Sequence, residues 1–193
     1  LYEEAGNLPL VIRAGLAHVQ FETIHPFLDG NGRVGRLLIT LYLCHSGVLT
    51  EPLLYLSLYL KQNRTTYYEL LDAVRARGDW EAWLVFFLNG VKETAEEAVK
   101  TTQRLKKRFD KDREQILSVG RRSGSALRVL DVLKERPMTS IQLAAARTGL
   151  SFPSAGTALA LLQEHGIVRE ITGRPRNRVY AYRQYRAILN EGT

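Results

Sequence analysis

The segment at residues 25–36 constrains the fold of this chain more than any other part of the sequence. It reads His-Pro-Phe-Leu-Asp-Gly-Asn-Gly-Arg-Val-Gly-Arg, and residues 25–32 include one proline and two glycines. That composition predicts a loop. Residues 8–21 before it and residues 33–44 after it are largely apolar, and their length favours helix over strand. The sequence therefore predicts a loop between two helices, the second of them buried.

The beginning of the second predicted helix has the properties of a phosphate-binding site. The first N–H groups of a helix lack partners within the helix and carry partial positive charge. Gly30 and Gly32 bracket Asn31 and let the backbone approach an anion closely. Arg33 and Arg36 are three residues apart and are predicted to share one helical face. Together these features predict a site for phosphate groups.

Two further residues of this segment have side chains suited to nucleotide chemistry. Asp29 precedes the predicted phosphate site, where a carboxylate can hold Mg²⁺ that bridges the phosphates. His25 lies four residues earlier, and imidazole titrates in the range suited to a general base. Residues 30–35 also fit the G-x-G-x-x-G pattern of dinucleotide-binding folds, but that motif requires a strand before the first glycine. Pro26 and the flanking helices argue against that interpretation.

The complete run from His25 to Arg36 resembles the H-x-F-x-[DE]-G-N-G-R-x-x-R signature of the Fic (filamentation induced by cAMP) domain, and every defined position is filled. Residues 20–24 and 63–71 are also similar to that family, so the resemblance covers roughly residues 5–115. It implies a protein adenylyltransferase, which moves AMP from Mg²⁺-ATP to a Ser, Thr or Tyr hydroxyl of a target protein and releases pyrophosphate. The motif leaves open removal of AMP, or transfer of another phosphate-containing group, on the same fold.

The resemblance also implies a role for each matched residue. His25 is expected to be the general base that takes the proton from the target hydroxyl. Phe27 is expected to be buried and to anchor the loop, and Asp29 is expected to bind Mg²⁺. The nucleotide phosphates are expected to contact Gly30, Asn31, Gly32, Arg33 and Arg36. Tyr68 is equally suited to the adenine side of the site or to core packing. The other histidines are interpreted as structural: His18, His45 and His165.

Two features common in the Fic family are missing from this sequence. One is an inhibitory helix with the pattern S/T-x-x-x-E-[GN], whose glutamate pairs with the second motif arginine, here Arg36. Residues 94–98 come near this pattern but lack its spacing and its final residue. The other is the β-hairpin flap that docks the target, of which only residues 1–8 remain. Because the chain begins at Leu1, we expect a fragment of a longer protein that is released from inhibition but docks targets poorly.

The pattern of residues 45–117 predicts further helices and no strand. Gly78 is expected to end a helix at residues 69–77, after a segment at residues 53–61. Asp79 is a good N-cap for a helix at residues 80–88. Residues 91–117 are charged and periodic, which indicates a separate long helix that packs along one narrow stripe. This first part of the chain is therefore predicted to be all-helical.

The distribution of charge divides the chain into two parts. Residues 1–117 have no net charge, whereas residues 118–193 carry the whole net charge of +7. A Gly- and Ser-rich stretch at residues 118–125 coincides with this change, so we predict a Fic domain at 1–117 and a second domain at 118–193. The charge asymmetry indicates an acidic partner for the second domain.

The second domain resembles a winged helix, a relative of the helix-turn-helix. Three predicted helices, at residues 126–135, 140–148 and 153–165, precede two predicted strands at residues 167–171 and 179–182. Leu159, Leu162, Ile167 and Val168 are expected to be core residues. The predicted fold class is therefore mostly α, an all-helical Fic core followed by a winged helix-turn-helix domain.

DNA binding is one interpretation of this second domain. Ser154 and Thr157 on the recognition helix would reach base edges, and wing arginines would contact phosphates. The wing is expected to hold Arg169, Arg174, Arg176 and Arg178, and the last three are the candidates for DNA contact. The recognition helix contains no Lys or Arg, which argues against strong DNA affinity. A protein-interaction or homodimer module is the alternative. A nucleotide-sensing, DNA-binding regulator is a further hypothesis for the whole chain, but a sensor would need no base such as His25.

Composition bears on where the protein works. The single cysteine, Cys44, cannot form an internal disulfide, which favours a reducing compartment, and we expect a cytoplasmic protein. No stretch reaches the roughly 18 consecutive apolar residues of a membrane-spanning helix, so no membrane partner is predicted.

Overall fold

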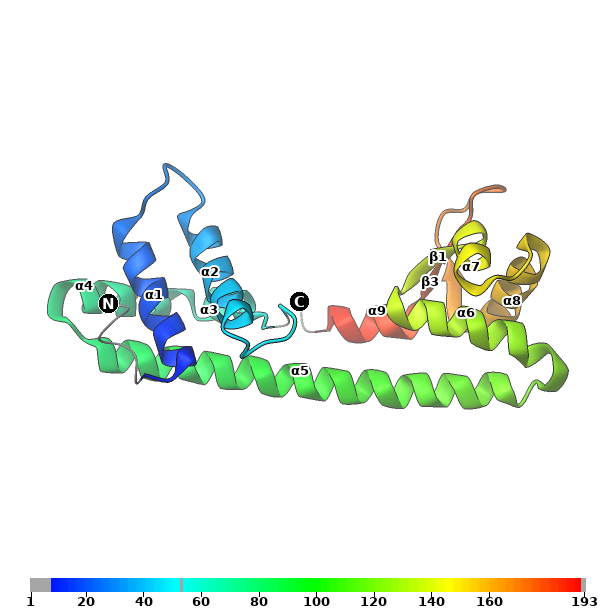
Figure 1. The fold of residues 1–193 in the computed structure, drawn as a ribbon, viewed down its shortest axis with the longest axis horizontal. Helices are drawn as coiled ribbons and strands as arrows, with labels where there is room; N and C mark the ends of the chain where they lie inside the picture. Colours follow the sequence, from blue (N-terminus) through cyan, green and yellow to red (C-terminus); the bar gives the residue numbers. More distant parts are fainter. Residues whose placement is uncertain (1–7, 53, 192–193) are drawn as a thin grey trace. The chain divides into compact units, whose positions relative to one another are not determined.

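The computed structural model describes residues 8–52 and 54–191. The chain divides into two compact units, residues 1–99 and 100–193 (Figure 1). The predicted remnant of the flap, residues 1–8, lies outside the described residues except for Leu8. Within the described ranges, no helix is both long enough and apolar enough to cross a membrane.

The first unit consists of helices, with no strand in its described residues. The two helices predicted around the glycine-rich segment are confirmed, and they run antiparallel on either side of its loop (Figure 1). The helices of this unit are α1 (Leu10–Ile24), α2 (Asn31–His45), α3 (Leu56–Gln62), α4 (Arg64–Arg77) and the beginning of α5 (Trp80–Leu117).

Residues 80–117 form the single helix α5, so the prediction of two separate helices at residues 80–88 and 91–117 is wrong. The predicted N-cap is confirmed, because Asp79 Oδ1 accepts a hydrogen bond from the N–H of Ala82 at 3.3 Å. Gly90 does not interrupt the helix. The ring of Tyr59 packs directly against it, in space that any larger side chain would occupy.

The core of the first unit is centred on Trp83 at the start of α5. Its side chain is fully buried, and its Nε1 donates a hydrogen bond to the carbonyl oxygen of Gly15 in α1 at 3.1 Å. Phe87, one turn later, is also fully buried and lies against the same glycine. Burial of these two rings holds α1 against α5, since aromatic side chains contribute large apolar areas.

The prediction that α2 is a buried helix is correct for one of its faces and wrong for the other. Ile39 and Leu43 are buried in the core, but Val34, Leu37 and Leu41 are exposed on the opposite face. Within the first unit α2 therefore behaves as an amphipathic helix, although its sequence is apolar on both faces.

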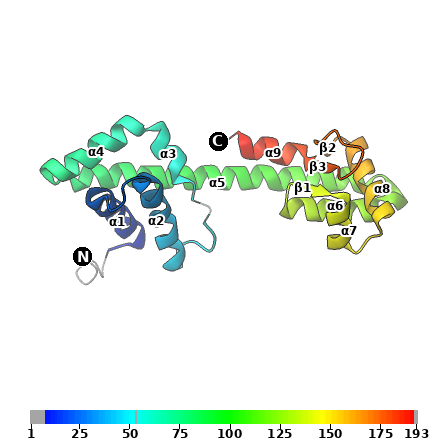
Figure 2. The same cartoon turned by 90° about the horizontal axis from the view of Figure 1, so that it is seen from above.

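The second unit combines helices with a three-stranded antiparallel sheet (Figure 2). The strand order is β1-β3-β2, with β3 in the middle. After the end of α5, its elements are η2 (Gly120–Arg122), α6 (Ser123–Glu135), β1 (Met138–Ser140), α7 (Ile141–Thr148), α8 (Phe152–Glu164), β2 (Val168–Glu170), β3 (Val179–Tyr182) and α9 (Arg183–Asn190).

Most elements predicted for this unit are present, with three differences. The predicted strands correspond to β2 and β3, but strand β1 was not predicted because it has only three residues and forms by pairing with β3, far along the chain. Residues 118–125, where the domain boundary was predicted, contain η2 and the start of α6. Helix α9 was also missed. The predicted core positions are confirmed as buried: Leu159, Leu162, Ile167 and Val168.

A buried carboxylate connects α5 to β3 within the second unit. Asp112 is fully buried, and its Oδ2 accepts hydrogen bonds from the Tyr182 hydroxyl at 2.6 Å and from Arg108 Nε at 2.8 Å. Burial raises the pKa of the Tyr182 phenol, and its bond to Asp112 acts in the same direction. This interaction explains why an aspartate occupies the buried stripe of α5, because a buried charge requires such partners.

The first compact unit ends at Val99 and the second begins at Lys100, so the division of the chain falls within α5. The boundary predicted from the sequence was at residues 117/118. The last part of the helix belongs to the second unit because Ile116 and Phe109 pack in that unit's core.

We predict that Tyr182→Phe destabilises the second unit by about 1–3 kcal/mol, because buried Asp112 loses one of its donors. Hydrogen exchange of β3 amides measures this change without contribution from the first unit. Tyr185→Phe is the matched control, since the Tyr185 ring packs in the same aromatic cluster and its hydroxyl has no hydrogen bond in the described structure. Equal protection of β3 in both variants would contradict the assignment.

Candidate active site

The loop between α1 and α2 is held by two residues in the left-handed backbone region. His25 ends α1 with φ 49° and ψ 57°, and its N–H donates to the carbonyl oxygen of Phe21 at 3.0 Å. This conformation is uncommon for a residue other than glycine. Gly30 precedes α2 with φ 82°, which glycine adopts without strain. The His25 side chain is left exposed at the end of α1.

The side chain of Asn31 holds this loop through two hydrogen bonds to its backbone. Its side chain is buried, and its Oδ1 accepts a hydrogen bond from the N–H of Phe27 at 2.9 Å. Its Nδ2 donates to the carbonyl oxygen of the same residue at 2.6 Å. Only an amide side chain supplies a donor and an acceptor in this way. The Asn31 side chain is therefore committed to loop structure, and its backbone N–H is the group left for a ligand.

The first turn of α2 presents unpaired backbone donors. The N–H groups of Asn31 and Gly32 have no acceptor in the described part of the chain, as is normal at a helix start. The N–H of Gly30 donates to Asp29 Oδ1 at 2.6 Å. Asp29 Oδ2 lies 3.4 Å from Arg33 Nη2, and both side chains are exposed. A carboxylate, a guanidinium and two free amides thus lie together at this helix start.

Arg36 lies deeper than Arg33. It is half-buried, and its Nη1 would lie 3.2 Å from a Cβ placed on Gly32. Its guanidinium thus lies beside the backbone of the first turn of α2. The two motif arginines therefore place one positive charge at the surface of the loop and one beneath it.

A buried polar layer lies between α1 and α2, behind the loop. His18 is fully buried, its Nε2 is 2.9 Å from the Tyr67 hydroxyl, and its ring stacks on Trp83. Burial lowers the pKa of His18 to about 4, and the positive charge of Arg36 acts in the same direction. His18 is therefore neutral at physiological pH, in agreement with its structural interpretation.

Glu22 is the second ionisable group of this layer, and it was not singled out in the sequence. Burial raises the pKa of its carboxyl, while the positive charges of His25, Arg36 and Arg75 oppose that shift. Arg75 Nη2 also donates to the carbonyl oxygen of Glu22 at 2.8 Å. The spacing of His18 and Glu22, four residues apart, is the sequence signal that would have placed both on the face of α1 turned towards α2.

Gly35 allows α1 and α2 to approach at this layer. A Cβ at this position would overlap Glu22 Oε1 and would lie 3.2 Å from atoms of both His18 and Phe21. Gly35 occupies an undefined position of the signature and is required for helix packing, whereas the positive φ of Gly30 shapes the backbone just before α2.

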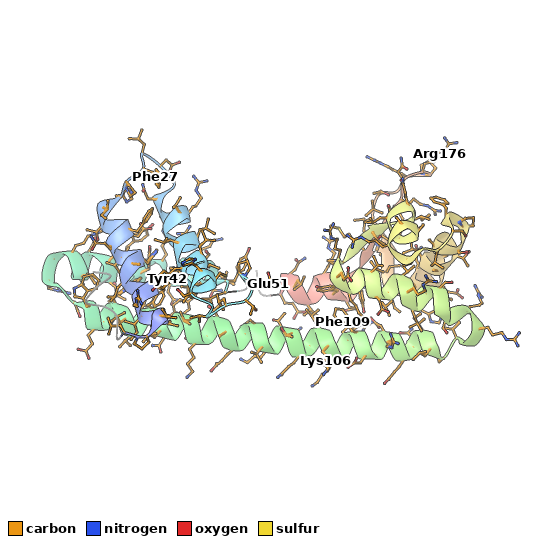
Figure 3. The ribbon with its side chains drawn as sticks, in the orientation of Figure 1. Phe27, Tyr42, Glu51, Lys106, Phe109 and Arg176 are labelled. Atoms are coloured by element: carbon orange, nitrogen blue, oxygen red, sulfur yellow. The ribbon has the colours of Figure 1, made fainter. Side chains whose placement is uncertain are left out.

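The structure brings the predicted site residues together at one end of the α1–α2 pair, with one correction. Phe27 is 51% exposed and points outwards at the tip of the loop, so the expectation that it is buried is wrong (Figure 3). Its backbone, held by Asn31, is what anchors the loop. Tyr68 is half exposed, against the edge of the buried Tyr67 ring and beneath Arg64, and so is not a core residue.

The predicted DNA-contacting residues lie in the second unit. The Ser154 hydroxyl is 2.8 Å from that of Ser151, and the Thr157 hydroxyl donates to the carbonyl oxygen of Pro153 at 3.1 Å. Both are exposed on the first turns of α8. The wing arginines are exposed in the loop between β2 and β3, where Figure 3 shows Arg176 pointing outwards.

Comparison with known proteins shows which family the beginning of the chain is similar to. The model of the Fic/DOC family matches residues 1–43, which include α1, the loop and most of α2. Two curated relatives, the protein adenylyltransferases Fic of Drosophila grimshawi and Drosophila mojavensis, are each 35% identical over 92 residues, 48% of this chain. The predicted resemblance to the Fic/DOC family is therefore confirmed for residues 1–43. The chain spans 18% and 17% of the lengths of these two relatives.

A solved structure supports the fold. The crystal structure of a Fic family protein from Desulfovibrio desulfuricans is 22% identical and aligns with a TM-score of 0.51. The alignment covers 94% of this chain and 51% of that protein.

We predict that Gly35→Ala destabilises the first unit by about 1–3 kcal/mol, because the added methyl group must displace the buried Glu22 carboxylate and crowds the rings of His18 and Phe21. Urea unfolding followed by Trp fluorescence measures this, since Trp80 and Trp83 both lie in the first unit. Gly32→Ala is the control, because its methyl group meets only the flexible end of Arg36. The packing argument fails if the two variants unfold alike.

We further predict that the first unit loses stability as the pH falls from about 6.5 to about 4. Across this range the unfolded chain binds a proton at His18 and the folded chain does not, so acid favours unfolding. The effect of this residue amounts to at most about 3 kcal/mol. Trp-detected unfolding of wild type and His18→Gln at several pH values tests it. Profiles of equal slope would show that His18 is not neutral in the fold.

Proposed function

We propose that the first unit is a protein adenylyltransferase site that transfers AMP from ATP to a hydroxyl of a target protein. The observation that carries this proposal is the junction of α1 and α2. There an exposed imidazole, two free amides and two arginines surround one loop, which the side chain of Asn31 holds in place. The two Drosophila relatives are named protein adenylyltransferases, which supports the same activity.

In this proposal His25 is the catalytic base. It takes the proton from the target hydroxyl as that oxygen attacks the α-phosphorus of ATP. A new P–O bond forms, the bond between the α-phosphorus and the bridging oxygen breaks, and pyrophosphate leaves. Positioning and electrostatic stabilisation account for most of the catalysis in such transfers.

The phosphates would be held by backbone amides and arginines. The free N–H groups of Asn31 and Gly32, with Gly30 beside them, form the anion hole, because oriented amides stabilise charge without reorganising. Arg33 and Arg36 would bind phosphate oxygens with their planar guanidinium groups. Tyr68, half exposed on α4, is proposed for the adenine side.

Asp29 fits a magnesium ion that is held mainly by the substrate. No group of three or more His, Cys, Asp or Glu residues within the described ranges could enclose a metal. Mg²⁺ is usually bound by one or two carboxylates together with substrate phosphates and water, and the exposed Asp29 carboxylate meets that requirement. The ion would neutralise phosphate charge, and Asp29 would exchange its contact with Arg33 for it.

For the second unit we propose a winged-helix fold. Its element order, α6-β1-α7-α8-β2-β3 with β1 beside β3, supports this assignment. Ser154, Thr157, Arg174, Arg176 and Arg178 stay candidates for DNA contact. Helix α8 contains no Lys or Arg, which favours a partner that binds elsewhere on this unit and not along α8.

We predict that wild-type protein incubated with Mg²⁺-ATP and acceptor protein gains the mass of one AMP group, and that His25→Ala reduces this rate by about 10²–10⁴-fold. Intact-mass spectrometry measures both. His45→Ala is the matched control, because His45 is exposed at the far end of α2 and keeps the rate.

Labelling by His25→Ala at the wild-type rate would overturn the assignment of the base. Loss of AMP from a modified acceptor, or gain of a different mass, would indicate the alternative reactions on the same fold. ATP binding without any mass change in the wild type would favour the nucleotide-sensing regulator.

A further inference from the structure

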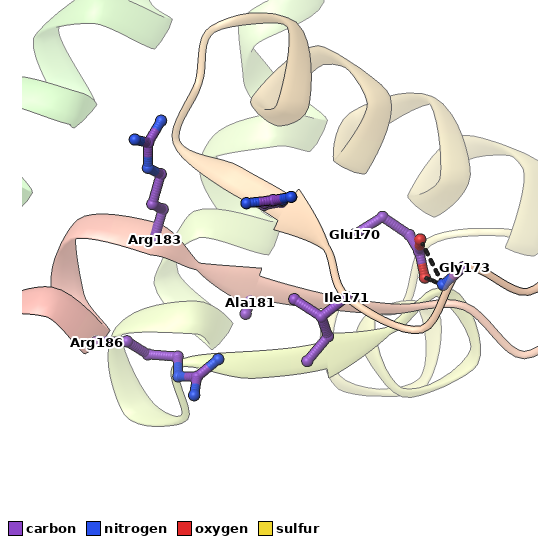
Figure 4. A pocket seen from close by; sticks show the side chains of 7 residues that line it. Glu170, Ile171, Gly173, Ala181, Arg183 and Arg186 are labelled. Carbon is purple, nitrogen blue, oxygen red and sulfur yellow. Dashed lines mark hydrogen bonds between the residues drawn. The ribbon is translucent and has the colours of Figure 1, made fainter.

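A pocket of about 520 Å³ opens on the outer face of the sheet in the second unit, at the base of the β2–β3 loop (Figure 4). Tyr180 and Tyr182 of β3 point into the core, so Ala181 between them faces the opposite side of the sheet. Arg169 of β2 is paired with Ala181 in the strand register and shares that face. The pocket is large enough for a small ligand, for which volumes of roughly 300–1,000 Å³ are usual.

Three arginines line this pocket, two of them from α9. Arg183 and Arg186 both line the pocket from that helix, and their side chains point in different directions (Figure 4). Arg169 approaches from the neighbouring strand β2. All three are exposed, and none forms an ion pair within the described residues. Their charges are thus uncompensated by the protein.

The one carboxylate of the pocket lining is engaged elsewhere. Glu170 accepts hydrogen bonds from the hydroxyl and the N–H of Thr172, the latter at 2.7 Å. It also accepts a bond from the N–H of Gly173 at 3.0 Å (Figure 4). The bond from the Thr172 hydroxyl and the two backbone bonds lower the pKa of Glu170, so it keeps its charge while it holds the start of the loop. The Glu170 carboxylate therefore stabilises the backbone at the end of the pocket away from α9. It does not pair with the three arginines, which can bind an external anion.

We propose that this pocket is a phosphate-binding site. Arginine suits phosphate because its planar fork donates two parallel hydrogen bonds to neighbouring oxygens. Ile171 and Ala181 add apolar surface beside the charges. The phosphate belongs to a nucleic-acid backbone or to a free nucleotide. The exposed wing arginines continue the positive charge along the same loop. The site differs from the proposed contacts of α8, and it does not depend on the proposed adenylyl transfer.

The experiment uses the full chain and two probes, inorganic phosphate and a short mixed-sequence DNA duplex. Phosphate is titrated while the arginine Nε–H signals are followed by NMR, and duplex affinity is measured by fluorescence anisotropy at several salt concentrations. The variant is Arg183→Ala with Arg186→Ala. The matched control is Lys106→Ala with Lys107→Ala, which removes the same charge from an exposed stretch of α5 in the same unit.

Phosphate should shift the Nε–H signals of Arg169, Arg183 and Arg186 in the wild type and in the lysine control. If the phosphate is that of nucleic acid, the arginine variant should bind duplex at least about tenfold more weakly, with a salt slope smaller by about 2. Phosphate-dependent shifts without duplex binding would support a free nucleotide as the source. The double variant Arg183→Lys with Arg186→Lys should retain only part of the binding, because lysine lacks the planar guanidinium group that donates two parallel hydrogen bonds.

The proposal is overturned if phosphate leaves these arginine signals unchanged and the arginine and lysine variants bind duplex with the same affinity and salt slope. It is also overturned if only a polyglutamate peptide shifts the signals, since the partner would then be an acidic protein. None of these outcomes involves His25, so they are separate from a failure of AMP transfer.

Discussion

The close approach of α1 and α2 at Gly35 is the constraint on which the candidate site depends. Without a side chain at that position, α2 lies directly over Glu22 and His18. The buried polar groups of α1 thereby come close to Arg36, and the first turn of α2 lies beside the end of α1. Tyr67 and Trp83 hold His18 from the other side. The short loop is held by the two hydrogen bonds of the Asn31 side chain, which preorganises its donors for an anion.

The second unit also contains a buried ionisable side chain that is held by hydrogen bonds. Asp112 is tolerated in its core because Tyr182 and Arg108 satisfy the carboxylate, and this network ties the end of α5 to the central strand. The positive charge of the unit, in contrast, lies outside the core. Six arginines lie on the β2–β3 loop or line the pocket on the outer sheet face, whereas α8 contains no Lys or Arg. Any anionic partner is therefore expected at the sheet rather than at α8.

Much of the fold could be predicted because it depends on local signals. Asp79 caps α5 by accepting a hydrogen bond from a residue three positions later, and glycine and proline mark the loop before α2. Both effects depend only on residues close together in the sequence. The failures involve distant contacts. Strand β1 exists because β3 pairs with it, and Gly90 stays helical because Tyr59 packs on it. The sequence around each of these positions carries no sign of its partner.

By itself, the sequence of residues 25–36 determined which chemical groups the candidate site holds: an imidazole, a carboxylate, amides and arginines at a helix start, since all of these lie within one short segment. Only the tertiary structure decided how they are held. It assigned the Asn31 side chain to the loop, left Phe27 exposed, and placed Glu22 and His18 behind Gly35. The reason is physical: burial and hydrogen bonding depend on which surfaces meet, and helices α1 and α2 meet only after folding.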